Sequence, residues 1–189
     1  MDKRIKDTEE KLHKAVIELL IDHSYQDISI NDICLKAGIK RPTFYNHYEN
    51  KDDFIEKACY GHFKKIIEES GIGDKASFKI YFLTLTEGYL KILDKYRDKI
   101  TPLREREDFK EINLVLTYTC SKLFEEKIAS LYPYELNKTL IETFSDAHVG
   151  VFIAITSKFI KNKDQDLKTL MKDLRKVFNI PTIEKDFKK

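Results

Sequence analysis

The sequence predicts an all-helical protein in which a small helix-turn-helix domain precedes a larger helical bundle. Three observations predict this fold class. The 189 residues include only four Pro and six Gly, and the helix-favouring residues Lys, Glu, Leu and Ile are abundant. Apolar residues recur three and four positions apart along most of the chain. The segment "SGIG", residues 70–73, separates short expected helices from longer ones.

The first two helices are expected from apolar spacing and capping residues. A helix from Asp7 to Asp22 carries an apolar stripe and opens with a capping-box pattern. Ser29, with Asp32 three residues on, is a second such pattern and starts a short helix. Gly38 ends that helix, because glycine takes a left-handed conformation at almost no steric cost.

A short third helix and a longer fourth helix complete the first part of the chain. Pro42 lies in the first turn of the third helix, where its missing N–H is no loss. Asn50 caps the fourth helix, which ends at the glycine pair. We therefore expect a helix-turn-helix domain over residues 1–49, a connecting helix over 50–70 and a helical domain over 71–189.

Beyond the junction, three amphipathic stripes predict long helices over residues 78–96, 109–131 and 167–178, with Pro102 in a connecting piece. The segment 136–160 differs, since apolar residues occupy nearly every side of it across "AHVGVFIAITS". A helix at the surface of a monomer would expose such residues, so we expect a second copy of the chain to cover it. The expected homodimer interface includes Gly150, Ala154 and Ser157 on this helix and Leu170 and Leu174 on the last one.

Bulk properties narrow the class of protein. Lys plus Arg exceed Asp plus Glu by only two, so any contact with nucleic acid must be local. The longest run without charge, residues 147–157, is too short to cross a membrane, and the start of the chain lacks a secretory pattern, so we expect a cytoplasmic protein without a membrane partner.

Cofactor, metal and enzymatic functions find no support in the sequence. Cys34, Cys59 and Cys120 are widely spaced and form no CxxC pair, so neither a disulfide framework nor a metal site is indicated. GxSxG, HExxH and phosphate-loop motifs are absent. We expect neither an enzyme nor a cofactor.

The segment from Ser29 to Tyr48, helix, turn and helix, has the spacing of a helix-turn-helix DNA reader. The longer stretch "LHKAVIELL…YQDISINDICLKAGIKRPTFYNHYENKDDFIEKA" resembles the N-terminal domain of TetR-type transcriptional regulators. The resemblance covers about Lys6 to Ala58, and "RPTFYNHYENK" is its most specific part. It implies a three-helix DNA-binding unit joined through the fourth helix to an all-helical ligand-binding and dimerisation domain.

The resemblance also implies roles for single residues. Phosphate contacts fall on Thr43, Tyr45, His47 and Lys51, and base-edge contacts on Arg41, Pro42 and Asn46. These assignments suit the chemistry, because hydroxyl and cationic groups position a protein on the backbone while Arg, Asn and Pro can distinguish bases. Asn31, in the first turn of the second helix, can help at a phosphate or a base edge. Lys40 stands where the family usually has a Ser or Thr cap, and its charge can serve DNA instead.

A small-molecule pocket is expected between the long helices, where bundles place such sites. Each aromatic residue alone is more often core, and a lone histidine is more often a hydrogen-bonded core residue than a ligand contact. The candidate set, supported by what the family does, is Phe82, Tyr89, Tyr118, Phe144, His148 and Phe152.

Two functional hypotheses follow. In the first, a homodimeric transcriptional regulator binds double-stranded DNA at a palindromic operator, as a repressor, and a small-molecule effector releases it. In the second, the helical scaffold acts through protein partners, as a co-activator or sequestering module with weak or no DNA binding. The second draws on the acidic balance of residues 1–60, which hold 10 Lys plus Arg against 12 Asp plus Glu.

Overall fold

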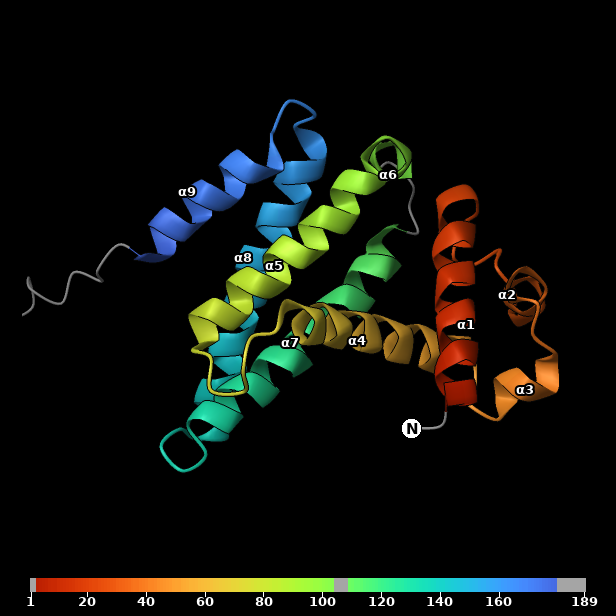
Figure 1. The fold of residues 1–189 in the computed structure, drawn as a ribbon, viewed down its shortest axis with the longest axis horizontal. Helices are drawn as coiled ribbons and strands as arrows, with labels where there is room; N and C mark the ends of the chain where they lie inside the picture. The colour runs from red at the N-terminus through yellow and green to blue at the C-terminus, as the bar shows by residue number, and fades with distance from the viewer. Residues whose placement is uncertain (1–2, 104–108, 180–189) are drawn as a thin grey trace, which may run out of the picture.

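The computed structural model describes residues 3–103 and 109–179, and within these ranges it contains helices and turns but no strand. The predicted all-helical fold class is confirmed (Figure 1). In chain order the helices are α1 (Lys3–Asp22), α2 (Ile30–Ala37), α3 (Arg41–Tyr45), α4 (Lys51–Ser70), α5 (Phe78–Lys95), α6 (Arg97–Leu103), α7 (Phe109–Leu131), α8 (Lys138–Lys161) and α9 (Leu167–Asn179).

Helices α1, α2 and α3 form one end of the molecule, and α4 runs from this end into the bundle of α5 to α9 (Figure 1). The three-helix end has its own apolar core, in which Leu12, Ile33, Phe44 and Phe54 are fully buried. Since Phe54 belongs to α4, the first turns of α4 are part of this core.

Local backbone chemistry at α2 agrees with the sequence. The Ser29 Oγ accepts the Asp32 N–H at 3.2 Å, and the Asp32 carboxylate accepts the Ser29 N–H at 2.8 Å, which completes the capping box. The Ser29 hydroxyl, which donates to the Asp32 carboxylate at 2.5 Å, and then the Ser29 N–H lower the pKa of the Asp32 carboxyl. Gly38 ends the helix with a φ of 68°, in the left-handed region.

The first helix starts earlier than the capping pattern indicated. It begins at Lys3, so Asp7 lies inside α1 and not at its N-terminal cap. There the Asp7 carboxylate pairs with the Lys11 ammonium at 2.6 Å, one helical turn further on. An i,i+4 ion pair of this kind supports the helix interior.

Helix α4 connects the two halves by packing against α5 and α7. Its close approach to α5 depends on Gly88, where an added Cβ would lie 2.2 Å from Ile66 Cγ2. The Tyr60 hydroxyl donates to the Glu126 carboxylate of α7 at 2.7 Å, and the Lys64 ammonium lies 3.2 Å from the same carboxylate. Because of the contact with Ile66, any side chain at position 88 of α5 would force α4 or Ile66 to move.

Helix α6 was not expected, because Pro102 was assigned to a connecting piece. Arg97, its first residue, donates from Nη1 to the Lys163 carbonyl at 2.9 Å, and its guanidinium lies 3.8 Å from the centre of the Phe159 ring. These contacts join residues far apart in the sequence. The local spacing of apolar residues therefore could not predict where α6 starts.

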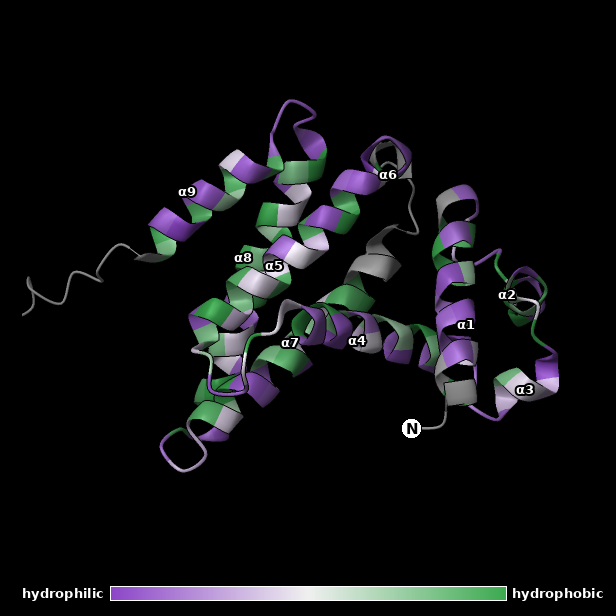
Figure 2. Ribbon diagram, in the orientation of Figure 1, coloured by the Kyte–Doolittle hydropathy of each residue, from purple (hydrophilic) through white to green (hydrophobic). Residues whose placement is uncertain are grey.

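Helix α9 uses its apolar face inside its own subunit. Hydrophilic and hydrophobic residues alternate along it (Figure 2), and Met171 is buried in a cluster with Leu90 and Phe159. Leu170 and Leu174 pack against the same cluster. Both leucines are only partly buried there, so their place at a homodimer interface stays a prediction.

Helix α8 is apolar on two faces, as expected. One face is buried and includes Val149 and Phe152, whereas Gly150 and Ala154 are exposed on the other. The exposed face also presents the large apolar side chains of Leu140, Phe144 and Val151. In the part of the chain that the structure describes, no helix combines the length and the apolar character that a membrane span requires.

Candidate functional site

The short helix α3 presents a cluster of polar side chains to solvent. Arg41, Pro42, Tyr45 and Asn46 are all exposed, and 47% of the Tyr45 surface is accessible. The Arg41 Nη2 donates to the Tyr45 hydroxyl at 3.2 Å, and the guanidinium lies 5.8 Å from the centre of the Tyr45 ring. These two contacts hold both side chains side by side on the outer face. Four of the seven residues that the resemblance singled out thus share one accessible surface.

The inner face of α3 is anchored by aromatic rings. Phe44 is fully buried, with ring centres 5.3 Å from both Tyr48 and Phe54. The Tyr48 and Phe54 rings meet edge to face, 4.8 Å apart. Such packing fixes how a five-residue helix sits on the domain, which a helix of this length cannot achieve through its own hydrogen bonds.

The cap of α3 lacks a side-chain acceptor. Lys40 occupies the N-cap position and makes no side-chain cap hydrogen bond. Its side chain is exposed, as is Asn31 in the first turn of α2. Leu35, one turn after Asn31, is 72% exposed, which is unusual for a leucine and was not foreseen. Its spacing of four from Asn31 places it on the same face of α2.

Three of the expected phosphate contacts are less accessible than α3's outer face. Thr43 and His47 are half-buried, and the His47 Nδ1 lies 3.9 Å from the Glu9 carboxylate. The Lys51 ammonium donates to the carbonyls of Tyr25 and Ile28, at 2.8 and 3.0 Å. Lys51 therefore ties the α1–α2 connection to the start of α4, because the carbonyls of an irregular segment need donors.

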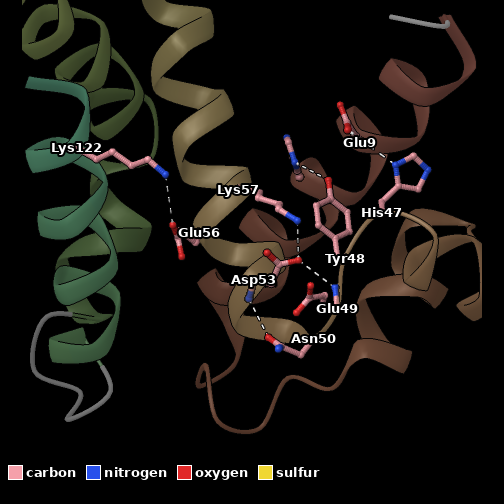
Figure 3. Close-up of polar contacts among 10 residues, drawn as sticks. Glu9, His47, Tyr48, Glu49, Asn50, Asp53, Glu56, Lys57 and Lys122 are labelled. Carbon is pink, nitrogen blue, oxygen red and sulfur yellow. Dashed lines mark hydrogen bonds and ion pairs between the residues drawn. The ribbon is translucent and has the colours of Figure 1, made fainter. Parts of the chain in front are cut away.

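A polar network joins the turn after α3 to α4 (Figure 3). The Asp53 carboxylate accepts the Glu49 N–H at 3.0 Å and pairs with the Lys57 ammonium at 2.9 Å, and both contacts lower the pKa of Asp53. Further along α4, Glu56 lies 4.0 Å from Lys122 of α7. The connection between α3 and the bundle is thus charged and hydrogen-bonded on this side.

On the other side of α1 lies a cavity of about 660 Å³, between α1, α4 and helices α5 to α8. Its wall is mainly apolar, with Leu20, Ile55, Phe63, Leu93, Val115 and Ile160 among the lining residues. Because both α1 and the bundle contribute, an occupant of this cavity would touch the three-helix end and the bundle at once.

The cavity matches the expected pocket only in part. Tyr89 and Phe152 lie on its wall, as does Ser157, which was expected at a dimer interface. Phe82, Tyr118, Phe144 and His148 do not line it. Their helices turn these positions away from this cavity, so their role at a ligand stays a prediction.

The positions of those four residues explain the difference. Phe82 is fully buried against Phe78 and Phe124, whereas 57% of Tyr118 and 44% of Phe144 is exposed. The His148 Nδ1 lies 2.8 Å from the Phe144 carbonyl, and the two rings are 4.2 Å apart. Apolar spacing identifies the buried face of a helix, but it does not tell whether that face meets a neighbour or a void.

Two histidines on the cavity wall were missed by the sequence reasoning. Burial, with a smaller contribution from the nearby His62, lowers the pKa of His13 to about 4. Burial also lowers the pKa of His62, whose Nε2 is buried and has no hydrogen-bond partner. Each histidine sits on an apolar stripe, in α1 and α4, but no spacing rule relates residues on different helices. Only the fold brings the two imidazoles together.

His13 also contacts Tyr48, one of the aromatic residues that support α3. Its Nε2 lies 3.3 Å from the Tyr48 hydroxyl. Burial raises the pKa of Tyr48, so its hydroxyl stays protonated, and the tautomer of His13 decides which of the two groups donates. His13 therefore stands between the cavity and the aromatic base of α3.

The polar side chains of the described residues form no metal site. Within residues 3–103 and 109–179, no group of three or more His, Cys, Asp or Glu side chains is arranged to hold a metal ion.

Comparison with known proteins agrees with this geometry. Residues 12–58 match the model for bacterial regulatory proteins of the tetR family. The HTH-type transcriptional regulator YxbF of Bacillus subtilis (strain 168) is 36% identical over 69 residues, 36% of this chain and 18% of that protein. The dhaKLM operon transcriptional activator DhaS of Lactococcus lactis subsp. lactis (strain IL1403) is 30% identical over 63 residues, 33% of this chain and 34% of that protein. In both cases the match spans only about a third or less of the relative's length.

Solved structures share the fold over nearly the whole chain. The dihydroxyacetone kinase operon activator DhaS superposes with a TM-score of 0.56 at 19% identity, covering 90% of this chain and 93% of the other. The fatty acid degradation regulator FadR from Bacillus halodurans gives 0.56 at 14%, covering 94% and 95%. FadR from Bacillus subtilis, in complex with stearoyl-CoA, gives 0.53 at 17%, covering 89% and 96%. The helix-turn-helix geometry and the family match agree: residues 12–58 match the family of bacterial regulatory proteins named after tetR, and the described part of the chain shares the fold of these solved regulators.

Proposed function

We propose that this protein represses transcription by binding a palindromic operator as a homodimer, and that a mainly apolar small molecule in the cavity releases it. The observation that carries the proposal is the exposed cluster on α3, held in place by a buried aromatic base. We further propose the division into residues 1–49, 50–70 and 71–189, with α4 shared between the reading end and the bundle.

The outer face of α3 supplies the chemistry for reading bases. Arg41 can donate two hydrogen bonds to guanine, Asn46 can pair with adenine, and Pro42 can contact a thymine methyl. The Tyr45 hydroxyl, beside Arg41, suits a phosphate oxygen. On α2, Asn31 and Leu35 are exposed as well.

The remaining cationic and hydroxyl groups have secondary roles in this proposal. Lys40 adds an exposed positive charge beside α3. Thr43 and His47, although half-buried, lie near enough to the surface to approach a phosphate after small side-chain movements. We assign Lys51 to the scaffold, since its ammonium already serves two carbonyls.

Dimerisation would proceed through the uncovered face of α8. Gly150 and Ala154 allow close approach of a second helix, and Phe144 and Val151 would be removed from water. A two-fold axis at this face would present two copies of α3 to successive major grooves, ~34 to 36 Å apart. Palindromic operators mirror that symmetry.

The cavity offers a physical route for release. An occupant would touch α1 and the bundle together, and His13 on the wall bonds to Tyr48 beneath α3. A ligand that binds the DNA-free arrangement better shifts the population toward it. One protein of this fold, FadR from Bacillus subtilis, has been solved with stearoyl-CoA, which supports an apolar ligand for this architecture.

Repression is the simpler mode, because occupying a promoter needs no surface beyond the DNA contact. The relative DhaS is an operon activator, so the mode needs a direct test. In vitro transcription from a promoter that carries the selected operator should fall when the protein is added and recover with ligand. A rise in transcription would replace repression with activation and leave DNA reading intact.

The proposed operator binding is tested by selecting bound sequences from a random duplex pool and measuring the affinity of the protein for the selected site. Arg41→Ala should cost about 1–3 kcal/mol of binding free energy. Tyr45→Phe should weaken binding, whereas Tyr134→Phe should not, because Tyr134 is fully exposed on the distant α7–α8 turn. Equal affinities for the wild type, Arg41→Ala and Tyr45→Phe would overturn the proposed reading face.

A second candidate function is a scaffold that acts through protein partners. It is favoured by the pairing of Lys36 with Glu18 at 3.3 Å, which offsets part of the positive charge near α2, and by the absence of a side-chain cap at Lys40. The random-pool selection separates the two candidates, since a partner-binding scaffold would enrich no sequence and would show no salt-dependent retention on DNA.

A further inference from the structure

Two imidazoles are among the polar side chains of the cavity wall. His13 comes from α1 and His62 from α4, and the charge of one affects the other. The wall around them is aliphatic and aromatic. A ligand with one polar group and an apolar body would therefore place that group at the histidines.

The two imidazoles favour a ligand that carries a hydrogen-bond acceptor. In the tautomer in which the Nε2 of His13 accepts the Tyr48 O–H, the ring proton resides on Nδ1, which is then a donor toward a ligand. The Nε2 of His62 is buried and has no partner. An unpaired buried polar atom of this kind costs free energy that a ligand oxygen would remove.

Neighbouring charges do not supply a fixed partner for a ligand's head group. Lys65 lowers the pKa of both histidines, but its ammonium is held between Glu10, at 3.3 Å, and Glu69, at 3.9 Å. Glu10 acts on His13 and Glu69 on His62 in the opposite sense. The other ionisable wall residues are Tyr25, Asp52, Cys59, Tyr89 and Tyr96.

Among the wall residues, Asp52 is the acid, and it does not suit a cationic ligand. Its side chain is exposed and accepts the hydroxyl of Tyr25. An ammonium head group would therefore find no buried anion near the histidines. A carboxylate would find two imidazoles that can acquire the positive charge it needs, since an opposite charge within about 4–6 Å favours the protonated form.

We propose that the cavity binds a monocarboxylic acid with an apolar tail, and that the His13–His62 pair takes up a proton from solvent as the carboxylate enters. This inference rests on the proposed function, because it concerns the same cavity. No covalent bond changes; the bound anion is balanced by one imidazolium shared between the two rings. Both histidines are otherwise neutral near pH 7 because burial disfavours their charged forms.

The test is calorimetry of the full chain without DNA, so it succeeds or fails independently of operator binding. Decanoate, decanol and decylamine serve as probes with one tail and three head groups. Decanoate should bind most tightly, and its apparent enthalpy should vary with the ionisation enthalpy of the buffer in the amount given by uptake of about one proton. Decanoate binding should also strengthen from pH 8 to pH 6.

Variants identify the responsible groups. His62→Gln keeps a hydrogen-bonding side chain but cannot become charged, so the preference for decanoate over decanol should fall on the order of tenfold. His23→Gln is the control, because His23 is exposed at the end of α1 and away from the cavity. If His62→Gln fails to fold, the buffer dependence of the wild type decides alone.

Three results would overturn the inference: no binding of decanoate, equal binding of decanol, or decanoate binding without proton uptake. Operator binding could persist in each case, which would separate this failure from failure of the proposed function. Conversely, proton-linked decanoate binding with no operator selected would support the ligand site while contradicting the regulator.

Discussion

Replacing His13 by Gln should remove a specific part of the acid sensitivity of this protein. In the folded state burial lowers the pKa of His13 from 6.5 to about 4. Above pH 6.5 the imidazole is neutral in both the folded and the unfolded chain, so it contributes no pH dependence. Between pH 6.5 and pH 4 the unfolded chain binds a proton that the folded chain does not, and stability falls as the pH falls.

The size of the effect follows from the two pKa values. One pH unit corresponds to about 1.36 kcal/mol, so the interval from 6.5 to about 4 amounts to about 3 kcal/mol lost at pH 4. His62, whose pKa is also lowered by burial, acts in the same direction and remains in the variant. The difference between wild type and His13→Gln therefore isolates the share of His13.

Urea unfolding followed by far-ultraviolet circular dichroism, from pH 7.5 to pH 4, measures this share. The wild-type curve of unfolding free energy against pH should be steeper than that of His13→Gln, and the two should run parallel above pH 6.5. His23→Gln is the control and should keep the wild-type slope, because His23 is exposed in the folded protein. Parallel curves for the wild type and His13→Gln down to pH 4 would refute the burial of a neutral imidazole at this position.

Three further substitutions test the backbone and packing arguments by urea unfolding. Gly88→Ala should destabilise by about 1–3 kcal/mol, since its Cβ would lie 2.2 Å from Ile66 Cγ2; Ile66→Ala in the same chain should recover part of the loss, and independent, additive effects would contradict the clash. Gly38→Ala should cost about 1–2 kcal/mol because of its φ of 68°, whereas Gly73→Ala, with open space around it and no positive φ, should be nearly neutral. Ser29→Ala should cost about 1 kcal/mol by removing the α2 cap, and an unchanged stability would mean that the cap is replaced by water.

Helices α2 and α4 could be predicted closely from sequence, because capping residues and a glycine near their ends set where they begin and end. The capping box at Ser29, the left-handed Gly38 and the Asn50 cap each depend on residues within a few positions of one another. The lack of a side-chain cap at Lys40 was likewise readable. In contrast, the inward role of Lys51 depends on the path of the α1–α2 connection, which is a tertiary property.

The bundle was predictable in its helices but not in what each face meets. The stripes of α5, α7, α8 and α9 were found at nearly the observed bounds. Leu170 packs against a cluster of its own subunit, and Phe82 lies in the core. The sequence could not predict either contact, because an apolar stripe does not show what it packs against. The start of α6 depends on Arg97 reaching carbonyls 66 and 68 positions away.

The central claim is that α3 enters the major groove in two copies. Methylation interference on the selected operator tests it directly, because methylation of guanine N7 alters the edge that faces the major groove. Modified guanines in two half-sites, about one helical turn apart, should block the wild type, and Arg41→Ala should lose its sensitivity at one guanine in each half-site. Binding that is indifferent to N7 methylation, or that depends on a single half-site, would contradict the account.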